Sequence, residues 1–234
     1  MALPKLETPT HELVLPSTNK KIKFRPFLVK EQKILYMAQN SKSESEIVNS
    51  VGQLVSNCTF GEVDPDIAPM FDIEYIFIKL RSKSVGETIE LSVLCPDDNK
   101  TRVPVKIKLD DVDVQMSTGH TNEVKLSDEM KLALRSPSLR DMKNVEGKDD
   151  VDKVFNILIK CIHEVHHKEK IYNAVDVTTK DLETFVEQMT TSQLQSIMNF
   201  FDSMPKLRHV IQVTNPNTKK KGEVVVEGLQ NFLG

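Results

Sequence analysis

The chain has 234 residues, of which 39% are hydrophobic and 28% are charged, with a formal net charge of −3. These totals fit a globular protein of one large domain or two lobes. Because the net charge is negative, the protein as a whole does not attract nucleic acid, and such binding would need a local basic patch. The three widely spaced cysteines do not form a disulfide framework, no stretch approaches the ~18 apolar residues of a membrane span, and the first residues lack a secretory signal pattern.

Residues 1–27 are predicted to form an N-terminal arm and a hairpin. Pro4 and Pro9 favour an extended arm. Apolar residues then alternate with polar ones on both sides of a turn, in HELVLPSTNKKIKF. This period of two is typical of paired strands with one buried face.

Residues 28–115 are predicted to form a helical lobe with a central hairpin. Helices are expected over 29–40, 41–57 and 70–84, and the last has apolar residues on most sides, which indicates burial between other elements. The hairpin follows as IELSVLCPDDNKTRVPVKIKLD, with the turn at CPDD.

Residues 124–234 are predicted to form a second helical lobe, after a polar boundary segment at 115–123. Short strands and a short helix come first, interrupted at Pro137. An amphipathic helix is expected over 149–167, and two later helices have threonine or serine N-cap candidates. The C-terminal hairpin turns at NPNT. The predicted fold class is therefore α+β, with about six helices and three β-hairpins.

The sharpest chemical pattern is HEVHH at residues 163–167, which satisfies HExxH. In zinc proteases, two histidines four residues apart on a helix bind the ion, and the glutamate takes a proton from the bound water. Here the histidines would be His163 and His167, with Glu187 as a third ligand. We favour the alternative of a helix end, where the helix dipole stabilises protonated imidazoles.

Two hairpin turns have a proline in the register of a zinc knuckle. In such a knuckle, CPxC at a hairpin tip directs two thiolates at one ion. In this chain the corresponding positions are Cys95 and Asp98 in one turn, and Asn215 and Thr218 in the other. Because asparagine and threonine are poor zinc ligands, we expect two metal-free hairpins, with a zinc site that includes Cys95 as the alternative.

The last hairpin and the tail offer candidate partner-binding residues. Lys219, Lys220 and Lys221 can contact phosphates or an acidic protein surface, or simply be a solvated tip. No aromatic residues interleave with them, so a stacking platform for single strands is not predicted. Leu229, Phe232 and Leu233 form a short apolar stripe that either docks on the chain's own core or enters a neighbour's groove.

Three other catalytic or nucleotide-binding motifs are missing from the sequence. GxxxxGK[ST], GxGxxG and GxSxG do not occur. We therefore expect no catalytic residues, no cofactor and no small-molecule substrate. A zinc metalloprotease, or a nucleic-acid-binding adaptor with a degenerate zinc-ribbon hairpin, are the alternative functions.

Three long stretches resemble one protein family, in the same order along nearly the whole chain. They are LPKLETPTHELVLPSTNKKIKFRPFLVKEQKILYMA, DIEYIFIKLRSKSVGETIE, and MPKLRHVI with VVVEGLQNFLG. The chain is similar here to the baseplate hub proteins of T-even-like contractile-tailed phages, whose members act in assembly of the central hub.

This resemblance implies a non-enzymatic structural or chaperone-like role. The implied partners are other baseplate hub and tail proteins, with no membrane and no nucleic acid. The implied location is the virion tail baseplate, or the host cytoplasm during assembly. The resemblance brings no catalytic residues with it, and it leaves open whether the protein stays in the mature particle.

Overall fold

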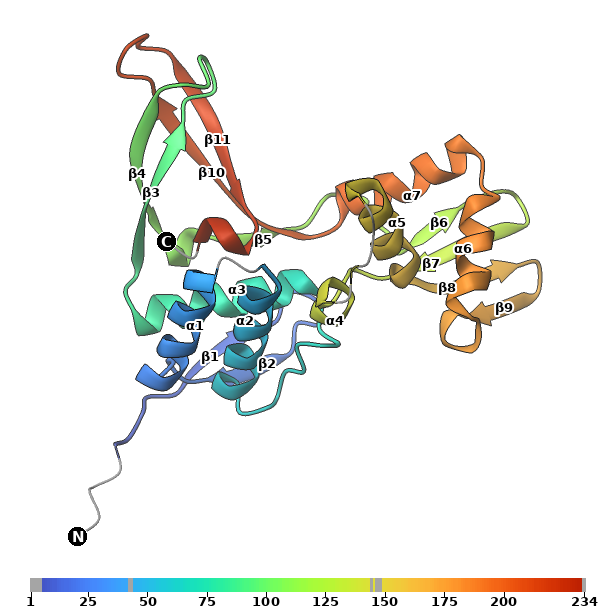
Figure 1. Cartoon of the computed structure of the whole chain (residues 1–234), viewed down its shortest axis with the longest axis horizontal. Helices are drawn as coiled ribbons and strands as arrows, with labels where there is room; N and C mark the ends of the chain where they lie inside the picture. Colours follow the sequence, from blue (N-terminus) through green and yellow to red (C-terminus); the bar gives the residue numbers. More distant parts are fainter. Residues whose placement is uncertain (1–5, 42–43, 144, 146–148, 233–234) are drawn as a thin grey trace. The chain divides into compact units, whose positions relative to one another are not determined.

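The computed structural model describes residues 6–41, 44–143, 145 and 149–232, and the chain divides into two compact units (Figure 1). Unit 1 comprises Met1–Gln115 and Lys206–Gly234, and unit 2 comprises Met116–Pro205. The described residues form seven α-helices, one of them only five residues long, and four small antiparallel sheets. The predicted α+β class and the three predicted hairpins are confirmed.

The C-terminal hairpin belongs to unit 1, which differs from the expected lobe of residues 124–234. Strand β10 (Lys206–Thr214) pairs antiparallel with β5 (Asp113–Gln115), and Leu207 lies opposite Val114. This pairing joins segments that are far apart in the sequence. The two compact units therefore differ from the predicted lobes at the C-terminal end.

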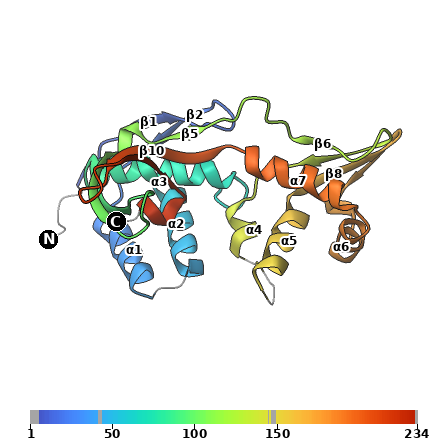
Figure 2. The same ribbon diagram turned by 90° about the horizontal axis from the view of Figure 1, so that it is seen from above.

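The body of unit 1 is a layered arrangement around one buried helix. Its elements are β1 (His11–Val14), β2 (Lys21–Phe24), α1 (Val29–Ser41), α2 (Glu44–Cys58) and α3 (Met70–Ser84). Figure 2 shows α3 between the β1–β2 hairpin and the α1–α2 pair. The α3 side chains with no solvent exposure are Ile73, Ile76, Phe77, Ile78 and Leu80. Because α3 is covered on both sides, it needs apolar residues around most of its circumference.

The second part of unit 1 is an arm, which we define as β3 (Thr88–Leu94), β4 (Arg102–Lys108), β10 and β11 (Lys221–Glu227). These strands form two hairpins that lie side by side (Figure 1). Each hairpin alternates along its strands between more buried and exposed residues, as expected for strands with one covered face. The short helices η1 (Leu109–Asp111) and η3 (Leu229–Phe232) follow the two hairpins.

Unit 2 has a four-stranded antiparallel sheet in the order β6-β7-β8-β9. The strands are β6 (Glu123–Lys125), β7 (Met130–Leu134), β8 (Ile162–His167) and β9 (Lys170–Asn173). The helices are α4 (Leu139–Lys143), α5 (Asp150–Cys161), α6 (Thr179–Glu187) and α7 (Thr191–Ser203). Its buried core consists of Val124, Leu132, Leu134, Leu158, Ile159, Ile162, Leu182, Val186, Ile197 and Phe200.

The helix predicted over 149–167 ends at Cys161, and the HEVHH segment lies in strand β8. The prediction was wrong there because β8 pairs with β7 on one side and with β9 on the other. Inter-strand pairing of this kind is a tertiary effect that overrides local helical periodicity. Val151 and Val154, in the first half of α5, are exposed, and the buried residues lie in its last turns.

Helix starts follow the expected capping chemistry. Asp149, Thr178 and Thr190 each accept a hydrogen bond from the backbone N–H three residues later. For α7 the N-cap is Thr190, and Gln193 completes a capping box. Among the residues that the structure describes, no helix has both the length and the apolar composition needed to cross a membrane.

Candidate interaction surfaces

Strand geometry separates the two histidines of the HExxH pattern. On a strand, residues four apart lie about 13 Å from each other along the axis, which is too far for two ligands of one zinc ion. His166 instead pairs with Glu164, at 2.6 Å between Nε2 and Oε2. No cluster of three potential metal ligands occurs in the described ranges. The arrangement that an HExxH protease requires is not formed by these residues.

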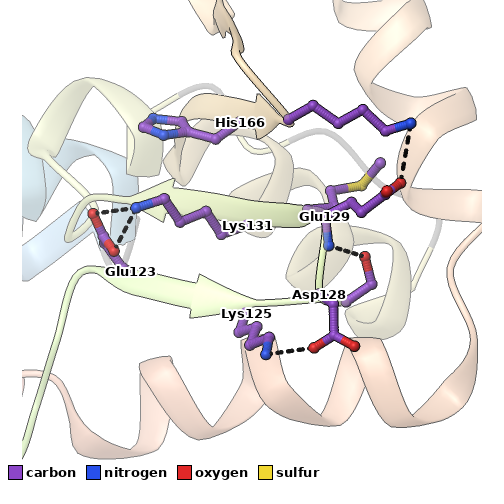
Figure 3. A pocket seen from close by; sticks show the side chains of 9 residues that line it. Glu123, Lys125, Asp128, Glu129, Lys131 and His166 are labelled. Atoms are coloured by element: carbon purple, nitrogen blue, oxygen red, sulfur yellow. Dashed lines mark hydrogen bonds and ion pairs between the residues drawn. The ribbon is translucent and has the colours of Figure 1, made fainter.

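A shallow pocket of about 370 Å³ lies over β6 and β7 (Figure 3). Its lining residues are Glu123, Lys125, Ser127, Asp128, Glu129, Met130, Lys131, His166 and Lys168. The charged groups pair with each other: Lys131 with Glu123 at 2.9 Å, Lys125 with Asp128 at 2.7 Å, and Lys168 with Glu129 at 3.3 Å. Exposed pairs of this kind contribute little energy, and they leave little charge for a ligand.

A second pocket in unit 2 is apolar and has a volume of about 240 Å³. It is lined by Met130, Val165, His167, Tyr172, Val177, Asp181, Leu182 and Phe185. Exposed Ile171 and Val175 lie close by in the sequence, on β9 and just after it. Strand β9 was not predicted, although its residues KIYN include the β-formers Ile171 and Tyr172. In the structure it follows a turn in which Lys168 has a φ of 54°.

The turns that carry the candidate zinc-knuckle positions face one another at the tip of the arm. Asn215 Nδ2 donates hydrogen bonds to Asp97 Oδ1 and to Asp98 Oδ2, both at 2.9 Å. Thr218 Oγ1 donates to Asp97 Oδ2 at 2.5 Å. Cys95 and Asn215 are completely buried. Hydrogen bonds between the two turns therefore lie at the positions where a zinc knuckle would have its cysteines.

Cys95 is a buried free thiol. Burial raises the pKa of Cys95, and the charges of Asp97 and Asp98 raise it further. A raised pKa keeps sulfur in the thiol form, which is neither a good nucleophile nor a metal ligand. For Asp97 the pKa is lowered, first by the hydrogen bonds from Thr218 and Asn215, so its carboxylate stays ionised within the contact.

The lysines of the C-terminal turn are exposed, as is Lys100 of the facing turn. Among the described residues, no ion pair involves Lys100, Lys219, Lys220 or Lys221. The neighbouring carboxylates of Asp97 and Asp98 accept hydrogen bonds from the facing turn or from their own turn instead. The tip of the arm therefore presents positive charge to solvent.

The tail residues predicted as partner contacts lie inside unit 1. Leu229 is 5% exposed and Phe232 is fully buried, which favours docking on the chain's own core. Leu233 lies outside the described residues. The Leu229 N–H donates to Glu74 Oε1 on α3 at 3.2 Å. Burial raises the pKa of Glu74 to about 7, and the charge of Glu227 adds to this rise.

Comparison with known proteins defines the class to which this fold belongs. The family model described as T4 bacteriophage base plate protein matches residues 8–234, so the chain belongs to this family of phage baseplate proteins. Over 216 residues the chain is 26% identical to the baseplate hub assembly protein gp26 of Enterobacteria phage T4, covering 92% of this chain and 93% of that protein. No solved structure matches the chain.

Proposed function

We propose that this protein is a non-enzymatic structural or assembly component of a phage tail baseplate hub, and that it acts through contacts with other hub and tail proteins. The observation that carries the proposal is the family match over residues 8–234, together with a relative of nearly equal length that is named a hub assembly protein. In this function the protein would be found in the host cytoplasm during assembly and would contribute to the tail baseplate.

The lysine tip is the surface that we propose for a partner. Lys219, Lys220 and Lys221 lie at a turn and have no carboxylate partner within the described chain. Long-range attraction from such a cluster accelerates encounter with an oppositely charged surface and helps to set orientation. The proposed partner surface is therefore an acidic patch on another baseplate protein.

Charge reversal at this tip tests the surface. A phage from which the gene has been deleted would be complemented in trans with wild-type protein or with K219E/K220E/K221E. We expect roughly tenfold fewer infectious particles from the variant, since like charges would now oppose the acidic partner. The control is K20E/K21E/K23E, which reverses three charges at the end of the turn and in strand β2 of the first hairpin, where Lys21 pairs with Glu12. Equal titres from both variants and the wild type would remove the tip from the interface.

The same variants distinguish a protein partner from nucleic acid. Duplex DNA would be titrated at low salt with the wild type and with K219E/K220E/K221E. We expect no binding that depends on the lysines. Binding that weakens steeply with salt and disappears in the variant would instead support a nucleic-acid adaptor.

The assembly role itself is tested by the particles that form without the protein. Tails from the deletion phage should lack complete baseplates in electron micrographs, while normal baseplates would refute the proposal. Quantitative mass spectrometry of purified particles beside infected-cell lysate then separates two forms of the role. A fixed ratio to tail proteins identifies a hub subunit, and presence in lysate alone identifies an assembly factor.

A further inference from the structure

All three hairpin turns of unit 1 have the same backbone frame. In each, the carbonyl of the residue before a proline accepts a hydrogen bond of 2.9 Å from the N–H four residues later. That later residue has a positive φ, between 51° and 63°. The first and fifth residues of the turns are Leu15 and Asn19, Cys95 and Asn99, and Asn215 and Lys219.

The fourth residue of each turn has the same local task. Thr18, Asp98 and Thr218 each accept a hydrogen bond from the backbone N–H two residues later, at 3.3, 2.9 and 3.3 Å. In a CPxC knuckle, the first and fourth positions are those from which two cysteines reach one ion. The shared frame thus places Cys95 and Asp98, and likewise Asn215 and Thr218, at knuckle positions.

Two of these turns are packed closely against each other. A Cβ added to Gly222 would lie only 2.5 Å from Pro96 Cγ, so the second hairpin approaches the first at a residue without a side chain. Asn217 Nδ2 also donates to Thr101 Oγ1 at 3.1 Å across the contact. The N-terminal turn shows the contrast: it has the same frame, but its Ser17 N–H donates to Asp72 of α3 at 3.1 Å, not to a second turn.

We infer that Cys95, Asp98, Asn215 and Thr218 occupy the four corners of a zinc-ribbon site, and that a hydrogen-bond network holds the two turns together where a metal would otherwise do so. The Asn215 amide supplies N–H donors to two carboxylates, and amide donors cannot bind a cation. Thr218 likewise donates its hydroxyl proton to Asp97. The donor set therefore fits a metal-free clasp between the hairpins and does not fit zinc.

Restoring the cysteines tests whether the four positions converge. The variant D98C/N215C/T218C retains Cys95 and would offer four thiolates. We expect about one zinc ion per chain by elemental analysis of protein without a histidine tag, and Co²⁺ should give the tetrahedral bands of a four-thiolate site. The matched control is L15C/T18C, which places two cysteines in the isolated N-terminal turn and should not give the four-thiolate spectrum. A cobalt spectrum without four thiolates in the triple variant would overturn the geometry.

A second measurement addresses the clasp in a chain that keeps its native cysteines. Hydrogen exchange in N215A should show protection falling roughly tenfold in both turns, 95–101 and 215–220, because the substitution removes the amide donor that joins them. The control T18A should affect only its own turn. A loss confined to residues 215–220 would show that Asn215 does not hold the first turn. Stoichiometric zinc in the wild type would equally overturn the inference.

Discussion

Glu74 gives the most quantitative prediction, because its carboxyl group is half-buried against the C-terminal segment and has a pKa of about 7. The folded state therefore holds a proton that the unfolded chain releases near the ordinary glutamate pKa of 4.5. The stabilising contribution of this protonation is fully present below pH 4.5, and it is lost as pH rises through 7. At pH 8 the ionised carboxylate costs up to about 3 kcal/mol in folding free energy.

The substitution E74Q removes this cost, because glutamine stays neutral and keeps a carbonyl oxygen for the Leu229 N–H. Urea unfolding of the wild type and E74Q would be compared at pH 5, 6, 7 and 8. We expect similar free energies of unfolding at pH 5, and E74Q to be more stable by about 1–3 kcal/mol at pH 8.

The control for this experiment is E90Q on β3. It removes a carboxylate from the same unit, but the Glu90 side chain is 78% exposed. Its difference from the wild type should be small and flat across the pH range. A difference between E74Q and the wild type that does not change from pH 5 to pH 8 would refute the argument that burial holds the Glu74 proton.

Three further substitutions test packing and polar contacts. F232A should lower the free energy of unfolding by about 3–5 kcal/mol, because Phe232 is fully buried; a loss below about 1 kcal/mol in chemical denaturation would contradict tail docking. G222A should cost about 1–3 kcal/mol through the clash with Pro96, and an unchanged melting temperature would show that the arm adjusts freely. D141A should lower the free energy of unfolding by about 2–3 kcal/mol, because Arg135 loses the carboxylate to which both of its terminal nitrogens donate hydrogen bonds. An unfolding midpoint equal to that of the wild type would refute this.

Local sequence patterns were sufficient to predict two kinds of element. One is a helix that is buried on most sides, and the other is a pair of strands joined by a short turn. Helix α3 was predictable because it is apolar around most of its circumference and is covered by two layers. The three hairpins were predictable from alternation on both sides of a proline turn. The similarity between the turns was predicted only for CPDD and NPNT. The first turn, PSTNKK, has the same proline, and in the structure Asn19 has a positive φ like the matching residues of the other two turns.

The remaining features depend on distant contacts. Ile162 continues the apolar stripe of α5, so nothing local indicates that the chain becomes extended there; the neighbouring strands β7 and β9 decide it. The pairing of Leu207 with Val114 is likewise set by the fold of unit 1. The hydrogen bonds between the two turns at the tip of the arm could not be predicted for a related reason. Asn215 and Asp97 are ordinary turn residues in the sequence, and only the fold brings them together.

The insertion of unit 2 between β5 and β10 determines the order in which the nascent chain matures. Gln115 and Lys206 are cross-strand partners, so the chain leaves unit 1 and re-enters it about 5 Å apart. Unit 2 is continuous in sequence and has all of its core available once Pro205 has left the ribosome. Unit 1 lacks strands β10 and β11 until the chain that follows unit 2 has been made. Translation therefore completes the second unit before the first, and the inner face of the β3–β4 hairpin remains uncovered until β10 and β11 are made.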